Sequence, residues 1–222
     1  MTSVPKLDGG HPSDNCMTPL YMAAVIVPHL KVAGVKSIWE CASGDGRLAD
    51  YFYDQGFSVA KSDINSGFDF LKIDLPVSDY DAIVTNVPFS KKVEFVKRAY
   101  ELKTKWAFIM PITIEGELCR MFDRYGMQEI TPYQRAHYKT PRQIASGLDY
   151  YWICANRVCH KENRVHHETI EPPQLCANCG GGKFKKSKYT AQVKTSWFTH
   201  NLNLPHDRIF VDLRNYGYPD FV

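Results

Sequence analysis

Four cysteines in the C-terminal half of the chain have the spacing of metal ligands. They form the pattern C-x4-C-x16-C-x2-C, made by Cys154, Cys159, Cys176 and Cys179. Two thiol pairs on separate loops suit tetrahedral Zn²⁺, and a site with four sulfur ligands keeps no open position for a catalytic water. We therefore predict a structural zinc ion bound by these four residues.

Other interpretations of this cysteine segment stay open. His160, His166 or His167 could replace one cysteine as a ligand, or the thiols could be free in a disordered segment. A CxxC pair also occurs in redox proteins, but the thioredoxin-like setting is absent. The other cysteines are scattered and are expected to be small buried residues: Cys16, Cys41 and Cys119.

A glycine-rich turn indicates a nucleotide pocket. The segment ECASGDG at 40–46 follows a predicted strand and precedes a predicted helix. Glycines let a ligand approach the backbone, and the amides at the start of the helix favour polar or anionic groups. Asp63 lies 17 positions beyond Gly46, at the tip of the second predicted strand, where its carboxylate could accept two hydrogen bonds from ribose hydroxyls. Together these residues predict a nucleoside-binding crevice.

Two further carboxylates have a structural and a functional interpretation. Asp69 lies between Phe68 and Phe70; it either caps a turn while the rings enter the core, or accepts a hydrogen bond from an adenine amino group. Asp45 either contributes to the crevice or caps the following helix.

The stretch DAIVTNVPFS at 81–90 ends an apolar strand with an amide, a proline and an aromatic ring at Asn86, Pro88 and Phe89. Such an ending either turns a corner or presents a site.

The elements that would position these residues alternate in type. Strands are predicted at 36–41, 57–62, 68–73, 80–85 and 105–110, and helices near 18–27, 46–55, 90–103 and 114–125. Pro28 is expected to limit the first helix. This alternation predicts an α/β fold with a parallel sheet and helices on both faces. The chain beyond 126 is strand-like, 154–188 has little periodicity, and 189–213 is again β-rich.

Composition sets few limits on function. Lys and Arg outnumber Asp and Glu by 27 to 24, a formal charge of +3, which permits an anionic partner without requiring one. No stretch approaches the roughly 20 apolar residues that cross a bilayer, and MTSVPKLDGG lacks the apolar core of a signal peptide. We expect a soluble cytoplasmic protein without a membrane partner; oligomeric state cannot be inferred.

The order of these motifs resembles a known family. Thr18-Pro19, ECASGDG at 40–46, SDI at 62–64, DFL at 69–71 and TNVPF at 85–89 together resemble S-adenosylmethionine-dependent adenine-N6 DNA methyltransferases, particularly the small stand-alone enzymes of phages. The resemblance covers roughly residues 16–155. It implies a Rossmann-like class I methyltransferase fold, with a mostly parallel seven-stranded sheet, acting in the bacterial host cytoplasm if a phage encodes it.

The resemblance also implies roles for individual residues. Thr18 and Pro19 would bind S-adenosylmethionine near its amino-acid end, and Glu40, Ala42 and Gly44 would bind it in the glycine loop. Asp63, beside Ile64, would bind the ribose, and Asp69, beside Phe70, would bind the cofactor adenine. Asn86 would also contact the cofactor. The catalytic segment would be Asn86, Val87, Pro88 and Phe89, in which the Asn86 side chain and the Val87 carbonyl hold the adenine amino group and Phe89 stacks on the extruded base.

The chain departs from the family pattern at Val87, where the DNA enzymes usually have a first proline. Ribosomal RNA adenine methyltransferases have an aliphatic residue there, so RNA remains an alternative substrate to DNA. A methyltransferase-like binding module without turnover is the third interpretation.

The expected organisation is an N-terminal arm at 1–15, a methyltransferase domain at 16–153, a small zinc-binding basic insert at 154–188 and a β-rich segment at 189–222 that packs on the main domain. A run of lysines is usually solvated surface. Beside a zinc module of a base-modifying enzyme, however, we predict that the lysines of the insert contact nucleic-acid phosphates: Lys183, Lys185, Lys186 and Lys188.

Overall fold

The structure is a computed structural model, and it describes residues 14, 17–73, 79–138, 150–156, 166–167, 171–176, 179–188 and 194–218. The chain forms two compact units. The first consists of Met1–Ala136 and Val193–Val222, and the second of His137–Gln192.

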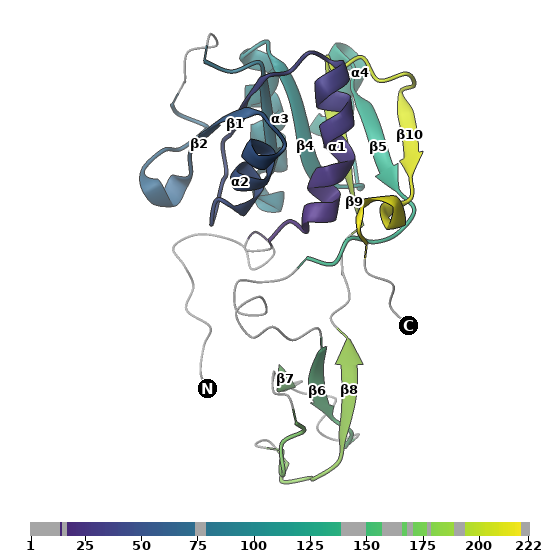
Figure 1. The fold of residues 1–222 in the computed structure, drawn as a ribbon. Coiled ribbons are helices and arrows are strands. Elements are labelled where there is room, and N and C mark those ends of the chain that lie inside the picture. Colours follow the sequence, from purple (N-terminus) through teal and green to yellow (C-terminus); the bar gives the residue numbers. More distant parts are fainter. Residues whose placement is uncertain are drawn as a thin grey trace. The chain divides into compact units, whose positions relative to one another are not determined.

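The first unit contains a seven-stranded sheet in the order β10-β5-β9-β4-β3-β1-β2 (Figure 1). Its strands are β1 (Ser37–Glu40), β2 (Ser58–Lys61), β3 (Ala82–Asn86), β4 (Lys105–Pro111), β5 (Gln128–Pro132), β9 (Thr195–His200) and β10 (Arg208–Val211). Neighbouring strands are parallel except around β9, which is antiparallel to both β4 and β5. The predicted α/β fold with a mostly parallel, Rossmann-like sheet is confirmed.

Helices cover both faces of this sheet. Figure 1 shows α1 (Leu20–Val32) and α2 (Arg47–Asp54) in front of it, and α3 (Lys92–Glu101) and α4 (Glu117–Tyr125) behind it. Three short 3-10 helices are η2 (Ile64–Ser66), η4 (Phe89–Lys91) and η5 (Leu213–Tyr216). None of the helices in the described ranges is long and apolar enough to span a bilayer.

Side-chain alternation along the strands divides the core between the two faces. Trp106, Phe108 and Met110 of β4 pack in one cluster with Phe95 of α3 and Phe122 of α4, because every second residue of a strand points to the same face. On the other face, the Trp197 Nε1 of β9 donates to the Met22 carbonyl of α1 at 2.7 Å. The β-rich C-terminal segment therefore contributes central and edge strands to the main sheet.

The first helix extends past Pro28, which corrects the predicted limit. Pro28 removes one intrahelical hydrogen bond, to the carbonyl four residues earlier. It lies on the exposed side of α1, whereas Ile26, Val27 and Leu30 are buried. The apolar contacts of the buried side keep the helix together, and water can satisfy a carbonyl on the other side.

The predicted strand at 68–73 is a turn, and this prediction was wrong. Gly67 has a left-handed φ of 86°, and the Asp69 carboxylate accepts from the Leu71 amide at 3.0 Å. The Asp69 carbonyl accepts from the amides of Lys72 and Ile73, both at 2.9 Å. These local bonds compete with a sheet ladder. The seventh strand of the sheet is instead β10, which pairs with β5 at the opposite edge.

The second unit contains a three-stranded antiparallel sheet in the order β7-β6-β8. Its strands are β6 (Tyr150–Cys154), β7 (His166–His167) and β8 (Phe184–Lys188). Strand β6 crosses the domain boundary predicted between residues 153 and 154, and it pairs with β8 of the predicted insert. The predicted domain limits remain a prediction.

Candidate active site and metal centre

A cleft opens at the edge where β1 and β3 end. It is lined by Asp14, Met17, Thr18, Glu40, Ala42, Ser43, Gly44, Asp45, Leu48 and Asn86. Five of the residues predicted to bind the cofactor therefore meet in one place: Thr18, Glu40, Ala42, Gly44 and Asn86. They come from the start of α1, the turn after β1 and the end of β3. Because the carboxyl ends of parallel strands share one sheet edge, distant segments of the sequence converge there.

The glycine turn is held against the end of β2 by two hydrogen bonds. The Ser43 amide donates to the Ser62 carbonyl at 3.0 Å, and the Gly44 amide donates to Asp63 Oδ2 at 2.8 Å. Gly44 and Gly46 have φ of 53° and 85°, in the left-handed region that side chains with a Cβ disfavour. The turn therefore favours glycine at both positions.

Asp63 fixes the turn from behind and is not among the residues that line the cleft. Its Oδ1 accepts from both the amide and the side chain of Asn65, at 2.9 and 2.8 Å, and its Oδ2 accepts from Gly44. A carboxylate has about four acceptor sites. One acceptor position remains, on Oδ2, so the predicted pair of ribose hydrogen bonds would require the exposed Asn65 side chain to move.

Glu40 is a fully buried carboxylate at the end of β1. Its Oε1 accepts a hydrogen bond from the Thr85 hydroxyl, and its Oε2 has no hydrogen-bond partner among the described residues. Burial raises the pKa of Glu40 to about 8, and the nearby carboxylates of Asp63 and Asp45 also raise it, although the Thr85 hydrogen bond acts in the opposite direction. A buried oxygen without a partner is costly, so this oxygen is suited to accept a bond from a bound donor.

The segment after β3 is anchored from both sides. The Val87 side chain is buried in the core cluster on the α3 face. The Pro88 carbonyl accepts from the Lys91 amide at 2.8 Å. The Ser90 amide and hydroxyl donate to the Asp14 carboxylate at 3.2 and 2.6 Å. Asn86 and Phe89 are half-buried, and only Asn86 of this segment lines the cleft.

The remaining predicted cofactor residues lie outside this cleft. Pro19 is the N-cap of α1, and Ile64 is an exposed residue of η2. Asp69 and Phe70 line a small separate cavity with Trp39 and Ser62. Burial alone would raise the pKa of Asp69, but the Lys72 amine and the Leu71 amide outweigh it and hold that pKa below its ordinary value.

Several residues of the cleft were not predicted from the sequence: Asp14, Met17, Ser43 and Leu48 as lining residues, and Thr85 as the partner of Glu40. Thr85 directly precedes Asn86 in β3, and this position next to a predicted site residue could have indicated that Thr85 belongs to the site. Asp45, which was considered only as a possible contributor, lines the cleft and also accepts from the Arg47 amide at 3.2 Å. The N-cap of α2 is Gly46, so this bond holds the turn just before the helix, and a cofactor role of Asp45 remains a prediction.

Three of the four predicted zinc ligands gather in the second unit. The Sγ atoms of Cys154, Cys176 and Cys179 all lie within 4.8 Å of one another, and those of Cys154 and Cys179 are 3.6 Å apart. Zinc–sulfur bonds of about 2.3 Å in a tetrahedron place the sulfurs about 3.8 Å apart. The thiol geometry therefore fits zinc. Cys159 and His160 lie outside the described residues.

Backbone hydrogen bonds shape the loop that bears Cys176 and Cys179. The Cys176 amide donates to the Gly181 carbonyl at 2.9 Å, and the Gly180 amide donates to the Cys176 carbonyl at 2.8 Å. Gly180 has a φ of 66°. The adjacent Lys183 and Lys185 are exposed; the side chains of Lys186 and Lys188 lie outside the description. The predicted phosphate contacts of all four lysines remain a prediction.

Comparison with known proteins gives weak likenesses. No protein-family model matches the chain, and no curated protein sequence matches it. The solved structure of the 23S rRNA methyltransferase ErmE has a TM-score of 0.34 and 14% identity, covering 78% of this chain and 66% of its own. That of MppP soaked with the product 2-ketoarginine has a TM-score of 0.28 and 12% identity, covering 46% and 40%. Likenesses this weak carry no argument about function.

The buried carboxyl of Glu40 makes stability depend on pH. Its pKa is about 8 in the folded protein against 4.5 ordinarily, so between these values the folded state holds a proton that the unfolded state has released. The contribution of Glu40 to the free energy of unfolding therefore falls as pH rises from 4.5 to 8. We expect the melting temperature of Glu40→Gln, relative to wild type, to increase between pH 5 and pH 8, as followed by circular dichroism.

Glu40→Ala serves as the comparison, because it also removes the charge but leaves a cavity that destabilises at every pH. A constant difference between wild type and Glu40→Gln across this range would contradict the expected protonation of Glu40.

The thiol cluster predicts one zinc ion per chain. Purified protein should contain one equivalent of zinc by inductively coupled plasma mass spectrometry, and Cys176→Ala should lose it because the tetrahedral set is broken. Cys119→Ala is the matched control: Cys119 was expected to be buried, but it is exposed on α4 and outside the cluster. Full zinc content in Cys176→Ala would contradict this assignment.

Proposed function

We propose that this chain transfers a methyl group from S-adenosylmethionine to the N6 amino group of adenine in DNA. The observation that carries the proposal is the convergence of Glu40, the Gly44 turn and Asn86 on one cleft. This convergence supports our proposal that the cleft holds a polar nucleoside-type cofactor beside an amide that can hold an exocyclic amine.

The charge of the cleft supports the cofactor. The carboxylates of Asp14 and Asp45 line it together with the Glu40 carboxyl, and Asp63 binds the turn behind it. S-adenosylmethionine has a sulfonium and an ammonium against one carboxylate, so neighbouring carboxylates favour it. The raised pKa of Glu40 keeps that carboxyl protonated at neutral pH; a bound ammonium would favour its charged form, and Oε2 would then accept from the ammonium. When bound, the cofactor supplies a methyl group already activated by the sulfonium.

The end of β3 supports adenine as the methyl acceptor. Adenine N6 is a weak nucleophile because its lone pair is delocalised into the ring. In the proposed reaction, the Asn86 side-chain oxygen and the Val87 carbonyl accept the two amino hydrogens and favour a tetrahedral nitrogen. The amino proton becomes acidic once the nitrogen is methylated, so the reaction depends on positioning rather than on a strong base.

Packing offers an explanation for the valine at position 87. A proline would stiffen the turn covalently, whereas the Val87 side chain is 1% exposed and held in the core. With Pro88 next to it, this anchor keeps the carbonyl direction fixed. Half-buried Phe89 is the residue we propose for stacking on an adenine that has been flipped out of a duplex.

RNA is the second candidate substrate. The specific observation that favours it is Val87 itself, since an aliphatic residue here is the pattern that the sequence analysis associates with RNA adenine methyltransferases. The cleft residues and their proposed roles are the same for either nucleic acid, so only a substrate assay separates the two.

Radiolabelled methyl transfer to DNA, to RNA and to a control without nucleic acid, followed by nucleoside analysis, tests the proposal. N6-methyladenine in DNA is the expected result, and label found only in RNA would favour the second candidate. If calorimetry detected S-adenosylmethionine binding while no nucleic acid was methylated, the protein would be a binding module on a methyltransferase-like scaffold, and the proposed activity would be rejected.

Two substitutions separate the proposed roles within the cleft. Asn86→Ala should abolish transfer, by a factor on the order of 10² or more for a lost transition-state hydrogen bond, while cofactor affinity measured by calorimetry stays close to wild type. Asp63→Ala should weaken cofactor affinity.

Asn86→Asp is the matched control because it keeps an acceptor oxygen at the same position, so it should retain more transfer than Asn86→Ala. The reverse pattern, in which Asn86→Ala loses the cofactor and Asp63→Ala loses only transfer, would mean that the two roles are exchanged.

A further inference from the structure

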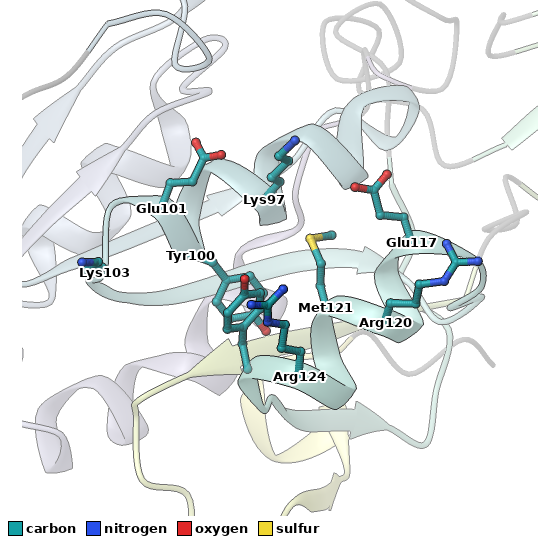
Figure 2. Close-up of a pocket in the computed structure, with 9 residues that line it drawn as sticks. Lys97, Tyr100, Glu101, Lys103, Glu117, Arg120, Met121 and Arg124 are labelled. Atoms are coloured by element: carbon teal, nitrogen blue, oxygen red, sulfur yellow. The ribbon is translucent and has the colours of Figure 1, made fainter.

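A pocket lies between α3 and α4, separate from the cleft described above. It is lined by Lys97, Tyr100, Glu101, Lys103, Glu117, Arg120, Met121, Arg124 and Tyr125. Figure 2 shows Lys97 and Glu101 on α3 facing Glu117, Arg120 and Arg124 on α4, with Met121 between the two walls. None of these residues was singled out by sequence motifs, and the proposed methyl transfer uses none of them.

The pocket is at the far end of α3 from Asn86. The helix begins next to the catalytic segment and runs about 15 Å, at about 1.5 Å per residue, to Glu101. Beyond it, Lys105 of β4 pairs with Ala82 at the start of β3, so the C-terminal end of α3 lies at the opposite sheet edge. A ligand in this pocket cannot be the nucleotide that reacts beside Asn86. A nucleic-acid strand, however, spans the length of α3 within a few nucleotides.

Positive charge dominates the rim of the pocket. Four cationic side chains face two carboxylates, and the Glu101 carboxylate is already paired with Arg98 at 3.6 Å. Within the part of the chain that the structure describes, Lys97, Lys103, Arg120 and Arg124 form no ion pair. Arg120 and Arg124 are four residues apart on one helix, an unfavourable arrangement for like charges that an anion between them would relieve.

The floor of the pocket orients one of these cations. The rings of Tyr100 and Tyr125 are 4.8 Å apart, and the Arg124 guanidinium lies 5.1 Å from the centre of the Tyr125 ring. The Tyr100 hydroxyl donates to the Gly126 carbonyl at 2.8 Å, which fixes the first ring. A guanidinium held against a ring loses less freedom on binding, and its planar donors match two oxygens of a phosphate.

From this arrangement we propose that the pocket between α3 and α4 binds backbone phosphates of a nucleic-acid strand, outside the nucleotide that is modified. The proposal rests on the proposed function for the identity of the strand. Its own basis is the set of exposed cations on two facing helices, Lys97 and Lys103 on one wall and Arg120 and Arg124 on the other.

The kind of donor favours a strand over a small phosphate compound. A small anion in proteins is typically held by backbone amides at a helix N-terminus, whereas the donors here are long side chains on both walls of the pocket. Arg124 is in the last turn of α4 and Lys103 lies just beyond the end of α3, where the helix dipoles oppose anions, so the attraction comes from the side chains. Such side chains bind a polyanion by counterion release, which adds with each phosphate contacted.

The test measures binding of a labelled single-stranded oligonucleotide, as DNA and as RNA, by fluorescence anisotropy from about 50 to about 200 mM salt. The variant R120Q/R124Q keeps good helix formers at both exposed positions. We expect it to weaken binding on the order of tenfold at the lowest salt and to reduce the slope of log affinity against log salt by about 1.4, for two lost contacts.

The matched control is K31Q/K36Q, which removes the same charge from exposed positions outside both the pocket and the cleft. It should keep the wild-type slope. A second variant, K97Q/K103Q, removes the other wall and should behave like R120Q/R124Q. Equal losses in the control and pocket variants, or no loss in either pocket variant, would overturn the proposal.

Two further measurements separate this proposal from the proposed function. If pyrophosphate binds the wild type but a saturating oligonucleotide does not displace it, the pocket serves a small phosphate compound and the proposal is overturned. Methyl transfer and cofactor binding are measured on the same samples. Pocket-dependent strand binding without any methyl transfer would support the pocket and reject the proposed function, whereas transfer with unaltered binding in both pocket variants would reject only the pocket.

Discussion

The hydrogen bonds of Asp63 hold the cleft in shape. One carboxylate joins the turn after β1, through the Gly44 amide, to the segment after β2, through Asn65. If this link were absent, Gly44 would have to find another acceptor, and the bond from the Ser43 amide to the Ser62 carbonyl would be left to hold the turn against the end of β2. The same side chain therefore sets the geometry of the glycine turn.

Much of the fold could be predicted from the sequence, since β1, β3 and β4 bury apolar side chains in short runs. The segment at 68–73 could not be, because Phe68 and Phe70 alternate as in a strand while Gly67 and Asp69 make local bonds that end one. Pro28 was expected to limit the first helix, but α1 continues past it. The reason is its exposed position on α1, which only the packed structure shows. The place of β9 between β4 and β5 is a tertiary pairing that no local pattern encodes.

The site was predictable where backbone conformation demands a residue type. Gly44 and Gly46 have left-handed backbones and stand out in any sequence, and Asn86 ends a buried strand. The partners of these residues were not predictable. Asp14 contacts Ser90 from 76 positions away, and the Glu40 bond to Thr85 spans 45 positions, so both depend on where the sheet brings the chain back. The thiol cluster was different, because ligand chemistry restricts the spacing of cysteines whatever elements carry them.

The near-neutral composition conceals a separation of charge within the main unit. The cleft at the carboxyl edge of the sheet has the carboxylates of Asp14 and Asp45 beside the carboxyl of Glu40, whereas the pocket at the other end of α3 has four cationic side chains against two carboxylates. A protein that brings a cationic cofactor to a polyanionic strand faces opposite requirements at the two ligands, since the charges that attract one repel the other. Placing them at opposite ends of one helix, separated by more than a Debye length of about 8 Å at physiological salt, lets each ligand meet its own local field.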